Sequence, residues 1–405
     1  MKDTTNTRVV ENIATPPSGV LWNRRFISLA AAIFLAFVNV AVFFQFYQYL
    51  SSLAIDPKWF GMIIGLFSAM SLILRPVISP LLHARNALRW ILICNAGVMV
   101  CLAAYGQAGS LWSMFLVRAL HGITHVGLAT ALMTVIISLI PLERSGQSFG
   151  LLSIVTLLPY AAIPPLLPVL TSWLGGYRNV LVFFAVVMIL VFPLVLMGVP
   201  DQRQSADPAE MQRLSFREVL ESLKDAKILV LFSVMLFFFS SYALVFYFLA
   251  EFGRTIQTAV AGLFFTLSSM SEIGVRLVAG SLFDKGDKIR LAVWSLIGIA
   301  VGYGLLGYVH GSLSLLALGV FLGLGWGVAM PILNALVFDI SEPRLRTFNV
   351  NLGMQMYQGG FFLGPFVGGL IVLHWGFRAL FSVCAGFTLI SVVLLAYLKS
   401  CRENE

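Results

Sequence analysis

The chain has 405 residues, of which 59% are hydrophobic and only 11% are charged, whereas about a quarter of the residues of a soluble domain are charged. A soluble globule of this size cannot hide so much apolar surface, so the composition excludes one and indicates that lipid is the main solvent. The formal net charge of +8 would suit a nucleic-acid-binding protein, but the placement of the basic residues gives it another meaning.

A polar stretch of about 25 residues begins the chain, and twelve long apolar segments follow. Each predicts a transmembrane helix, because a span takes roughly 20 apolar residues and the segments lack the alternation of barrel strands. The first, after Arg24 and Arg25, is too long for the core of a cleaved secretion signal. We therefore expect an all-α membrane protein. The predicted spans are 26–50, 58–80, 89–108, 112–140, 147–170, 179–199, 228–250, 258–281, 290–309, 313–338, 347–372 and 377–398.

The basic residues lie mainly on one side of these spans. With the N-terminus inside, 19 of the 26 Lys and Arg residues fall in cytoplasmic segments. The others are Lys58, Arg178, Arg254 and Arg378 in outer loops, and Arg75, Arg118 and Arg276 within spans. This asymmetry is the positive-inside pattern. It predicts a multi-pass protein of a bacterial inner membrane with both termini in the cytoplasm, and it gives no reason to expect a nucleic-acid partner.

A charged segment at 200–227 divides the chain into two blocks of six spans. It carries six acidic and five basic residues, and its second part has apolar residues spaced among the charges. We expect a cytoplasmic linker with a short amphipathic helix. The predicted domains are then an N-terminal six-helix bundle at 1–199 and a C-terminal six-helix bundle at 228–405.

The two blocks resemble each other at a constant offset, which indicates an internal repeat. At an offset of 201 the matched pairs are Gly61 and Gly262, Arg75 and Arg276, and Arg89 and Arg290. At an offset of 200 they are Arg144 and Arg344, Pro165 and Pro365, and Gly176-Tyr177-Arg178 and Gly376-Phe377-Arg378. Duplicated six-span halves are typical of carriers whose binding site lies between the halves near the bilayer midplane.

Span 4 carries three ionisable residues on one face. Arg118, His121 and His125 are spaced i, i+3 and i+7, and residues at this spacing share a helix face. Because ionisable groups are costly within a membrane and histidine titrates near neutral pH, the stripe suits proton coupling or anion binding. The alternative is that Arg118 is a structural anchor bonded to backbone carbonyls, while the histidines line a wet vestibule.

Span 8 carries Glu272 and Arg276, which are four residues apart and can therefore pair. Glu272 is a candidate for the carboxylate that exchanges a proton. A structural salt bridge that supports the nearby cytoplasmic loop is the favoured interpretation, because Arg276 repeats Arg75.

Residues 280–288 read GSLFDKGDK and resemble the loop signature GxxxD(R/K)xG(R/K) of the major facilitator superfamily. The counterpart between spans 2 and 3 has Ser79 in place of the glycine and His83 in place of the aspartate. Arg118 and Gly122 resemble the RxxxG element of that family's proton-coupled exporters. A further resemblance, to the GxxxGPxxGG pattern of antiporters, is carried by Gly360, Gly364, Pro365, Gly368 and Gly369 in span 11, where close helix packing is also expected.

The resemblance implies two pseudo-symmetric six-helix bundles, with a cavity lined by spans 1, 4, 7 and 10. Span 11 adds two polar residues of its own, Gln355 and Gln358. The candidate cavity residues are Asn39, Gln45, Gln48, Tyr242, Tyr247, Trp326, Asn334, Gln355 and Gln358. A charge network between helix ends would form a gating latch that breaks as the halves rock. Its candidate members are Arg75, Arg276, Gly280, Asp284, Lys285 and Lys288.

The function that these features favour is secondary transport of a small or amphipathic solute, driven by protons, with export favoured. Uptake by a solute–proton symporter is the alternative, and a lipid-modifying membrane enzyme is a third candidate. The sequence contains no GxxxxGK(S/T) or HExxH motif, and we expect no enzyme. The four cysteines form no CxxC pair, so neither a disulfide framework nor a zinc site is indicated. We expect no metal and no other cofactor. The expected partners are the solute and the lipid bilayer, and the expected state is a monomer.

Overall fold

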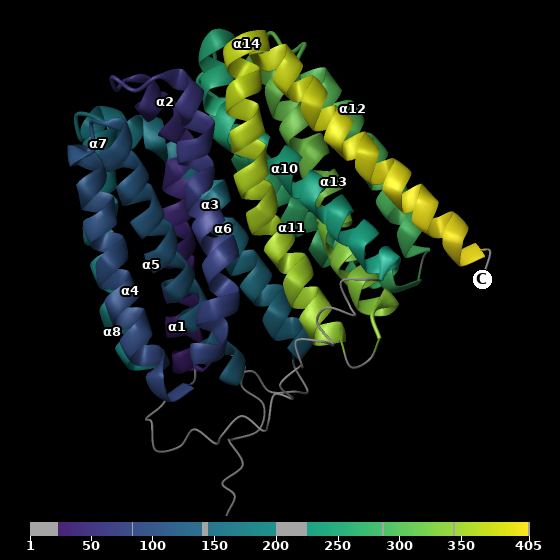
Figure 1. Cartoon of the computed structure of the whole chain (residues 1–405), viewed down its shortest axis with the longest axis horizontal. Coiled ribbons are helices and arrows are strands. Elements are labelled where there is room, and N and C mark those ends of the chain that lie inside the picture. The colour runs from purple at the N-terminus through teal and green to yellow at the C-terminus, as the bar shows by residue number, and fades with distance from the viewer. Residues whose placement is uncertain are drawn as a thin grey trace, which may run out of the picture.

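The computed structural model describes residues 23–82, 84–139, 145–199, 225–285, 287–342 and 345–403. The predicted amphipathic helix of the linker lies almost entirely outside these residues. Within the described part, the chain is a bundle of long helices that run up and down (Figure 1). We call the end of the bundle at which α1 and α10 begin the terminal end, and the opposite end the far end.

The first half of the chain forms six membrane-spanning segments. Two of them are interrupted by a short 3-10 turn and remain single spans, and two others begin or end with such a turn. They are α1 (Arg24–Ala41) with η1 (Val42–Gln45) and α2 (Phe46–Ser51); η2 (Pro57–Trp59) with α3 (Phe60–Ile78); α4 (Ala84–Ala104) with η4 (Tyr105–Gln107); α5 (Leu111–Ser138); α6 (Ser145–Trp173); and α7 (Tyr177–Val187) with η6 (Met188–Leu190) and α8 (Val191–Gly198). A further 3-10 turn, η3 (Ser79–Leu81), follows α3.

The second half comprises α10 (Ala226–Thr255), α11 (Ala261–Lys285), α12 (Lys288–Leu306), α13 (Ser312–Ile340) and α14 (Arg346–Glu403). Side chains cap several helices, as Asn23 does for α1, Asp225 for α10 and Asp287 for α12. The apolar part of α14 runs over 49 residues, about 74 Å at 1.5 Å per residue, which is more than twice the thickness of the hydrocarbon core.

Gly376 divides α14 into two spans. Its φ of 75° and ψ of −175° are not helical, and the left-handed region of φ favours glycine. In Figure 1 the chain rises to the far end along the first part of α14 and returns along the second. The described residues contain 11 helices long and apolar enough to cross a membrane when α14 is counted once. With α14 divided they give twelve, so the twelve predicted spans are confirmed.

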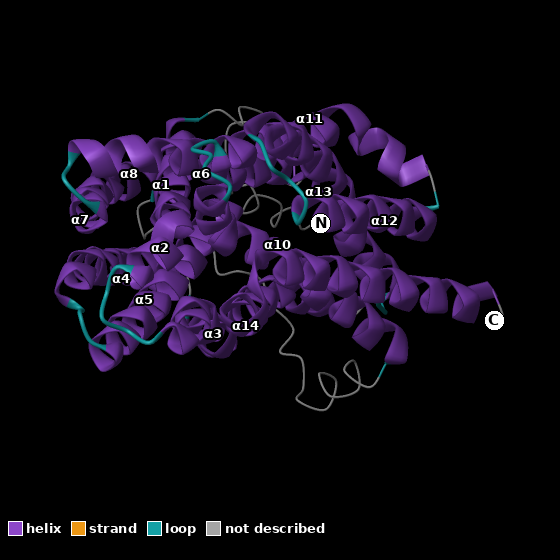
Figure 2. Ribbon diagram, turned by 90° about the horizontal axis from the view of Figure 1, so that it is seen from above, coloured by secondary structure: helices purple, strands orange, loops and turns teal. Residues whose placement is uncertain are grey.

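The helices form two bundles, α1–α8 and α10–α14, which lie side by side (Figure 1 and Figure 2). Their most extensive contacts are made by two pairs of helices, α3 with α14 and α6 with α11. The pairs are related by the internal repeat, since α11 repeats α3 and the first part of α14 repeats α6.

Glycines and prolines of the repeat meet at these two crossings. A Cβ at Gly61 of α3 would collide with the carbonyl oxygen of Pro365 in α14. A Cβ at Gly262 of α11 would lie 2.6 Å from the carbonyl oxygen of Pro164 and from Pro165 in α6. Each glycine therefore allows two backbones from different bundles to touch near the far end. The contact is made twice, once for each copy of the repeat.

The glycines of α14 also permit close packing inside the second bundle. A Cβ at Gly360 would lie 2.6 Å from the backbone of Phe239, and one at Gly364 would lie 2.6 Å from the carbonyl oxygen of Ser240. Gly368 lies against the side chain of Leu244, and Gly369 lies against the backbone of Gly61 in the other bundle. The first part of α14 thus contacts α10 on one side and α3 on the other.

Candidate functional site

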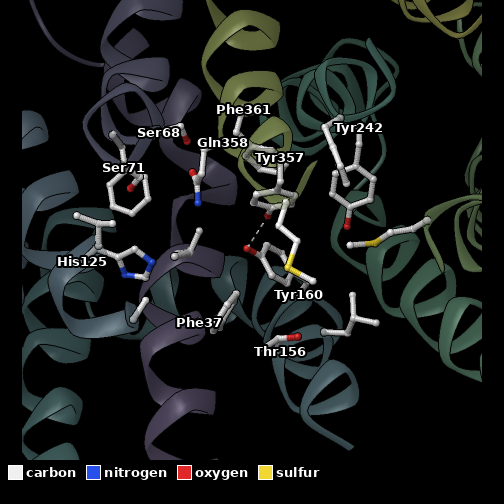
Figure 3. Close-up of a pocket in the computed structure, with 18 of the residues that line it drawn as sticks. Phe37, Ser68, Ser71, His125, Thr156, Tyr160, Tyr242, Tyr357, Gln358 and Phe361 are labelled. Carbon is white, nitrogen blue, oxygen red and sulfur yellow. Dashed lines mark hydrogen bonds between the residues drawn. The ribbon is translucent and has the colours of Figure 1, made fainter. Parts of the chain in front are cut away.

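A cavity of about 270 Å³ lies between the two bundles. The lining residues of α3 and α5 belong to the second halves of those helices, and those of α14 to its first turns, so the cavity extends from the middle of the bundle toward the terminal end. Its walls are mainly aromatic and aliphatic, with a few polar groups. Figure 3 shows Ser68, Ser71 and His125 on one side of it, Tyr242 on the other, and Tyr160 and Tyr357 between them. This combination is typical of a site for a partly apolar small molecule.

An aromatic layer closes the space between the bundles on the far side of the cavity. The ring centroid of Phe44 lies 5.9 Å from that of Phe246 and 5.3 Å from that of Phe265, and Tyr47 lies 4.9 Å from Phe248. The four phenylalanines are almost fully buried. Each contact joins α1–α2 of the first bundle to a helix of the second, so the structure is closed at the far end.

The cavity unites some of the predicted residues and leaves others outside it. Those that line it are His125, Tyr242, Tyr247, Glu272, Trp326, Asn334 and Gln358. Those that do not are Asn39, Gln45, Gln48, Arg118, His121 and Gln355. The lining residues for which sequence reasoning gave no expectation include Ser68, Ser71, Thr156, Tyr160 and Tyr357. The spacing of Ser68, Ser71 and Arg75 at i, i+3 and i+7 was a signal for a shared face on span 2.

Asn39 joins the two histidines of α5. Its side-chain Oδ1 lies 3.0 Å from Nε2 of His121, and its Nδ2 lies 3.3 Å from Nδ1 of His125. The Nδ1 of His121 lies 3.1 Å from the hydroxyl of Tyr105. Asn39, His121 and Tyr105 have no exposed surface, and His125 lies at the cavity wall. A continuous hydrogen-bonded chain thus runs from the cavity into the first bundle.

The donors and acceptors of this chain are consistent with two neutral histidines. Because an amide nitrogen only donates, Nδ1 of His125 accepts, and its proton lies on Nε2. The amide oxygen of Asn39 accepts from Nε2–H of His121, so Nδ1 of His121 accepts from the hydroxyl of Tyr105. This assignment of tautomers follows from the hydrogen-bond partners. A proton bound at Nδ1 of His125 would require the Asn39 amide to turn over and would reverse every donor up to Tyr105.

Arg118 lies at the inner end of this chain. It donates from Nη1 to the hydroxyl of Tyr105 at 3.3 Å and from Nη2 to the carbonyl oxygen of Ile64 at 3.2 Å. The guanidinium carbon lies 4.4, 4.7 and 4.8 Å from the ring centroids of Phe43, Phe46 and Phe67. Arg118 is 1% exposed, and none of the ion pairs between described residues includes it. Cation–π contacts and a carbonyl therefore hold this buried charge.

Glu272 and Arg276 of α11 form a buried ion pair. Nη2 of Arg276 lies 2.5 Å from Oε1 of Glu272, while its Nη1 donates to the hydroxyl of Ser153 in α6 at 2.8 Å. The pair therefore also links the second bundle to the first. The other carboxylate oxygen of Glu272, Oε2, is buried and has no hydrogen-bond partner within the described residues. Glu272 belongs to the wall of the cavity.

The predicted latch residues have different surroundings. Arg75 lines the cavity, and Arg276 is held by Glu272 and Ser153. Lys288 forms an ion pair with Asp339 at 2.7 Å, which joins the start of α12 to the end of α13. Gly280, Asp284 and Lys285 belong to the last turns of α11, but their side chains lie outside the described ones. The latch as a whole stays a prediction.

Comparison with known proteins gives the family and the fold. The family model described as Major Facilitator Superfamily matches residues 29–288 and again 249–404. The multidrug resistance protein MdtG of Escherichia coli is 27% identical over 344 residues, which cover 83% of each chain. The structure of a bacterial homolog of the human lysosomal transporter Spinster has a TM-score of 0.72 at 15% identity and covers 94% of this chain and 96% of its own. The nucleoside transporter NupG has a TM-score of 0.71 at 15% identity, with 92% and 98% covered.

Proposed function

The chain belongs to the Major Facilitator Superfamily, and on this premise we propose that it is a proton-coupled secondary transporter that moves a small amphipathic solute by alternating access. The observation that carries the proposal is the cavity between two repeat-related bundles, which an aromatic layer closes at one end. Rocking of the bundles about this cavity would open the aromatic layer and close the terminal end.

The positive-inside pattern supports placing the terminal end in the cytoplasm of a bacterial inner membrane. The structure then represents the state in which the cavity is closed toward the outside. Export is the favoured direction, because the relatives at 27% identity are named multidrug resistance proteins. Uptake by symport remains the alternative. Since the whole cavity is made by one chain, a monomer suffices for transport, and the chain needs no catalytic activity.

Proton coupling would use the chain from His125 to Arg118. His125 lies where water or solute in the cavity can reach it, and protonation there would reverse the donors along Asn39, His121 and Tyr105. The reversal alters the hydrogen bond that Arg118 donates to Tyr105. A protonation event in the cavity is thereby transmitted to a buried charge between α3 and α5, where it can change how the helices pack. Glu272 is the second candidate, because its Oε2 accepts no hydrogen bond from any described residue.

Replacing His125 with asparagine is expected to uncouple transport from protons. The side-chain oxygen of asparagine can lie near the position of the histidine Nδ1 and accept the hydrogen bond that Asn39 donates. Unlike histidine, asparagine does not titrate. In liposomes containing the purified protein, solute exchange without a gradient should persist, whereas accumulation driven by a pH gradient should be lost. His310→Asn is the matched control, because His310 is exposed in a loop at the far end. Gradient-driven accumulation in His125→Asn at the native level would refute this role and leave Glu272 as the coupling group.

A further inference from the structure

The two repeats differ at the residue four positions before their shared arginine, where a carboxylate could neutralise its charge. At the offset of 201, Arg75 matches Arg276 and Ser71 matches Glu272. In the second repeat the carboxylate of Glu272 lies 2.5 Å from Arg276. In the first repeat serine stands in place of the carboxylate, and none of the ion pairs between described residues includes Arg75. Among the described residues, the arginine of the first repeat therefore lacks the anionic partner that its counterpart in the second repeat has.

Both residues of this incomplete pair face the cavity. Ser68, Ser71 and Arg75 share one face of α3 and line the cavity together, and Figure 3 shows Ser68 and Ser71 on the same side as His125. Ser71 is 1% exposed, and its hydroxyl has no hydrogen-bond partner among the described residues. A buried hydroxyl without a partner is unusual in a folded protein. A ligand atom in the cavity would give it one.

The charged side chains at the cavity give it a net positive charge. Its described charged lining residues are Arg75 and Glu272. Glu272 is offset by Arg276, and His125 is neutral in the hydrogen-bonded chain. Within the described part of the chain, Arg75 is thus a charge of the cavity wall without a counter-ion. An arginine binds a carboxylate through two parallel hydrogen bonds. Across the cavity, Oε2 of Glu272 has no hydrogen-bond partner among the residues that the structure describes. It can only accept while ionised, so it suits a hydroxyl or N–H group.

We propose that the transported solute is a small aromatic carboxylate, whose carboxylate occupies on Arg75 and Ser71 the place that Glu272 occupies on Arg276 in the other repeat. The inference rests on the proposed function, because it names the substrate class of the same cavity. The aromatic body lies among Tyr160, Tyr242 and Tyr357, and a hydroxyl on its far side donates to Oε2 of Glu272. Such a solute binds α3 of one bundle and α11 of the other, so its binding is sensitive to the distance between them.

The test measures binding of 6-hydroxy-2-naphthoate to the full chain in lipid nanodiscs by calorimetry. The methyl ester of the same compound removes the charge, 2-naphthoate removes the hydroxyl, and 6-hydroxy-2-naphthylmethylamine reverses the charge. Arg75→Gln is expected to weaken binding of the acid by roughly 10- to 100-fold, as for the loss of a hydrogen bond to a charged group, and to leave the ester unchanged. Arg254→Gln, which removes an exposed arginine at the far end, should have no effect.

Ser71→Glu supplies the missing carboxylate within the protein. It should pair with Arg75 as Glu272 pairs with Arg276, and abolish binding of the acid while the protein stays folded. Ser71→Ala should weaken binding of the acid roughly fivefold without lowering thermal stability, because the hydroxyl has no hydrogen-bond partner in the described part of the chain. Equal affinity of Arg75→Gln and the native protein for the acid, or tighter binding of the ester or the amine, would overturn the inference.

Flux measurements separate this inference from the proposed function. Binding of the acid through Arg75 without its movement across liposomes would contradict transport and leave the assignment of the anion site standing. Gradient-driven movement of the amine or the ester, with no binding of the acid, would contradict the anion site and leave transport standing.

Discussion

Replacing Arg118 with methionine is expected to lower the proton-driven transport rate by roughly 100-fold, at the upper range of coupling between two sites, while the protein stays folded. Arg118 is buried and pairs with no carboxylate of the described residues. A buried charge of this kind costs several kcal/mol of stability, and its removal leaves no opposite charge without a partner. Methionine keeps the apolar stem against Phe43, Phe46 and Phe67. It deletes the donor to Tyr105 at the end of the histidine chain.

The measurement compares pH-driven solute flux in liposomes with the unfolding temperature of the same preparation. Arg118→Lys serves as the second variant, because lysine keeps the charge but cannot reach Tyr105 and Ile64 with two separate nitrogens. It should retain part of the flux. A structural anchor predicts the opposite pattern, with a lower unfolding temperature for Arg118→Met and normal flux in the molecules that remain folded.

Replacing Gly61 with valine is expected to hold the far end open. The new Cβ would meet the backbone of Pro365, and backbone atoms cannot move aside as a side chain can. Overpacking of this kind costs about 1–3 kcal/mol, which shifts the balance between the closed and open far end by roughly 5- to 150-fold. Transport should fall accordingly, because the variant returns rarely to the state that the structure shows.

Chemical labelling reports this shift directly. A cysteine at Ser68, which lines the cavity, should react with a membrane-impermeant maleimide added from outside in the Gly61→Val background, and only slowly in the native one. Of the four native cysteines, Cys94, Cys101 and Cys384 are buried, and Cys401 is replaced by serine in both backgrounds. Gly274→Val is the matched control, because a Cβ at Gly274 of α11 meets nothing within 4 Å. Equal labelling in the two glycine variants would exclude the contact of Gly61 with Pro365 as part of the closure.

The sequence predicted the spans well because their determinants are local. Hydropathy and length define each helix, and the repeat of Gly176 and Gly376 marks the turns between spans 5 and 6 and between spans 11 and 12, where both glycines have positive φ. The repeat also identified Gly61 with Gly262 and Pro165 with Pro365. The sequence did not predict that Gly61 contacts Pro365 and that Gly262 contacts Pro165. These contacts depend on how the two bundles pack against each other, which the sequence of a single helix does not determine.

The site was predicted less completely, since helix periodicity gives the residues that share a face but not what covers that face. Asn39 was expected in the cavity, but α5 covers it, and it joins His121 to His125. Gln45 belongs to the 3-10 turn η1, next to the aromatic layer that begins with Phe44. Arg75 was assigned to a latch by analogy with Arg276. Its place on the cavity wall followed only from the position of α3 between α5 and α14.

The central claim is that the two bundles rock about one cavity, so that one end opens as the other closes. Spin labels test it most directly in a background without native cysteines, with one pair at Gly109 and His310 on the far end and another at Ser79 and Arg290 on the terminal end. All four positions are exposed, and each pair spans the two bundles. When protons, solute or the Gly61→Val substitution shift the equilibrium, the first distance should lengthen as the second shortens. Distances that stay fixed, or that change in the same direction, would contradict alternating access.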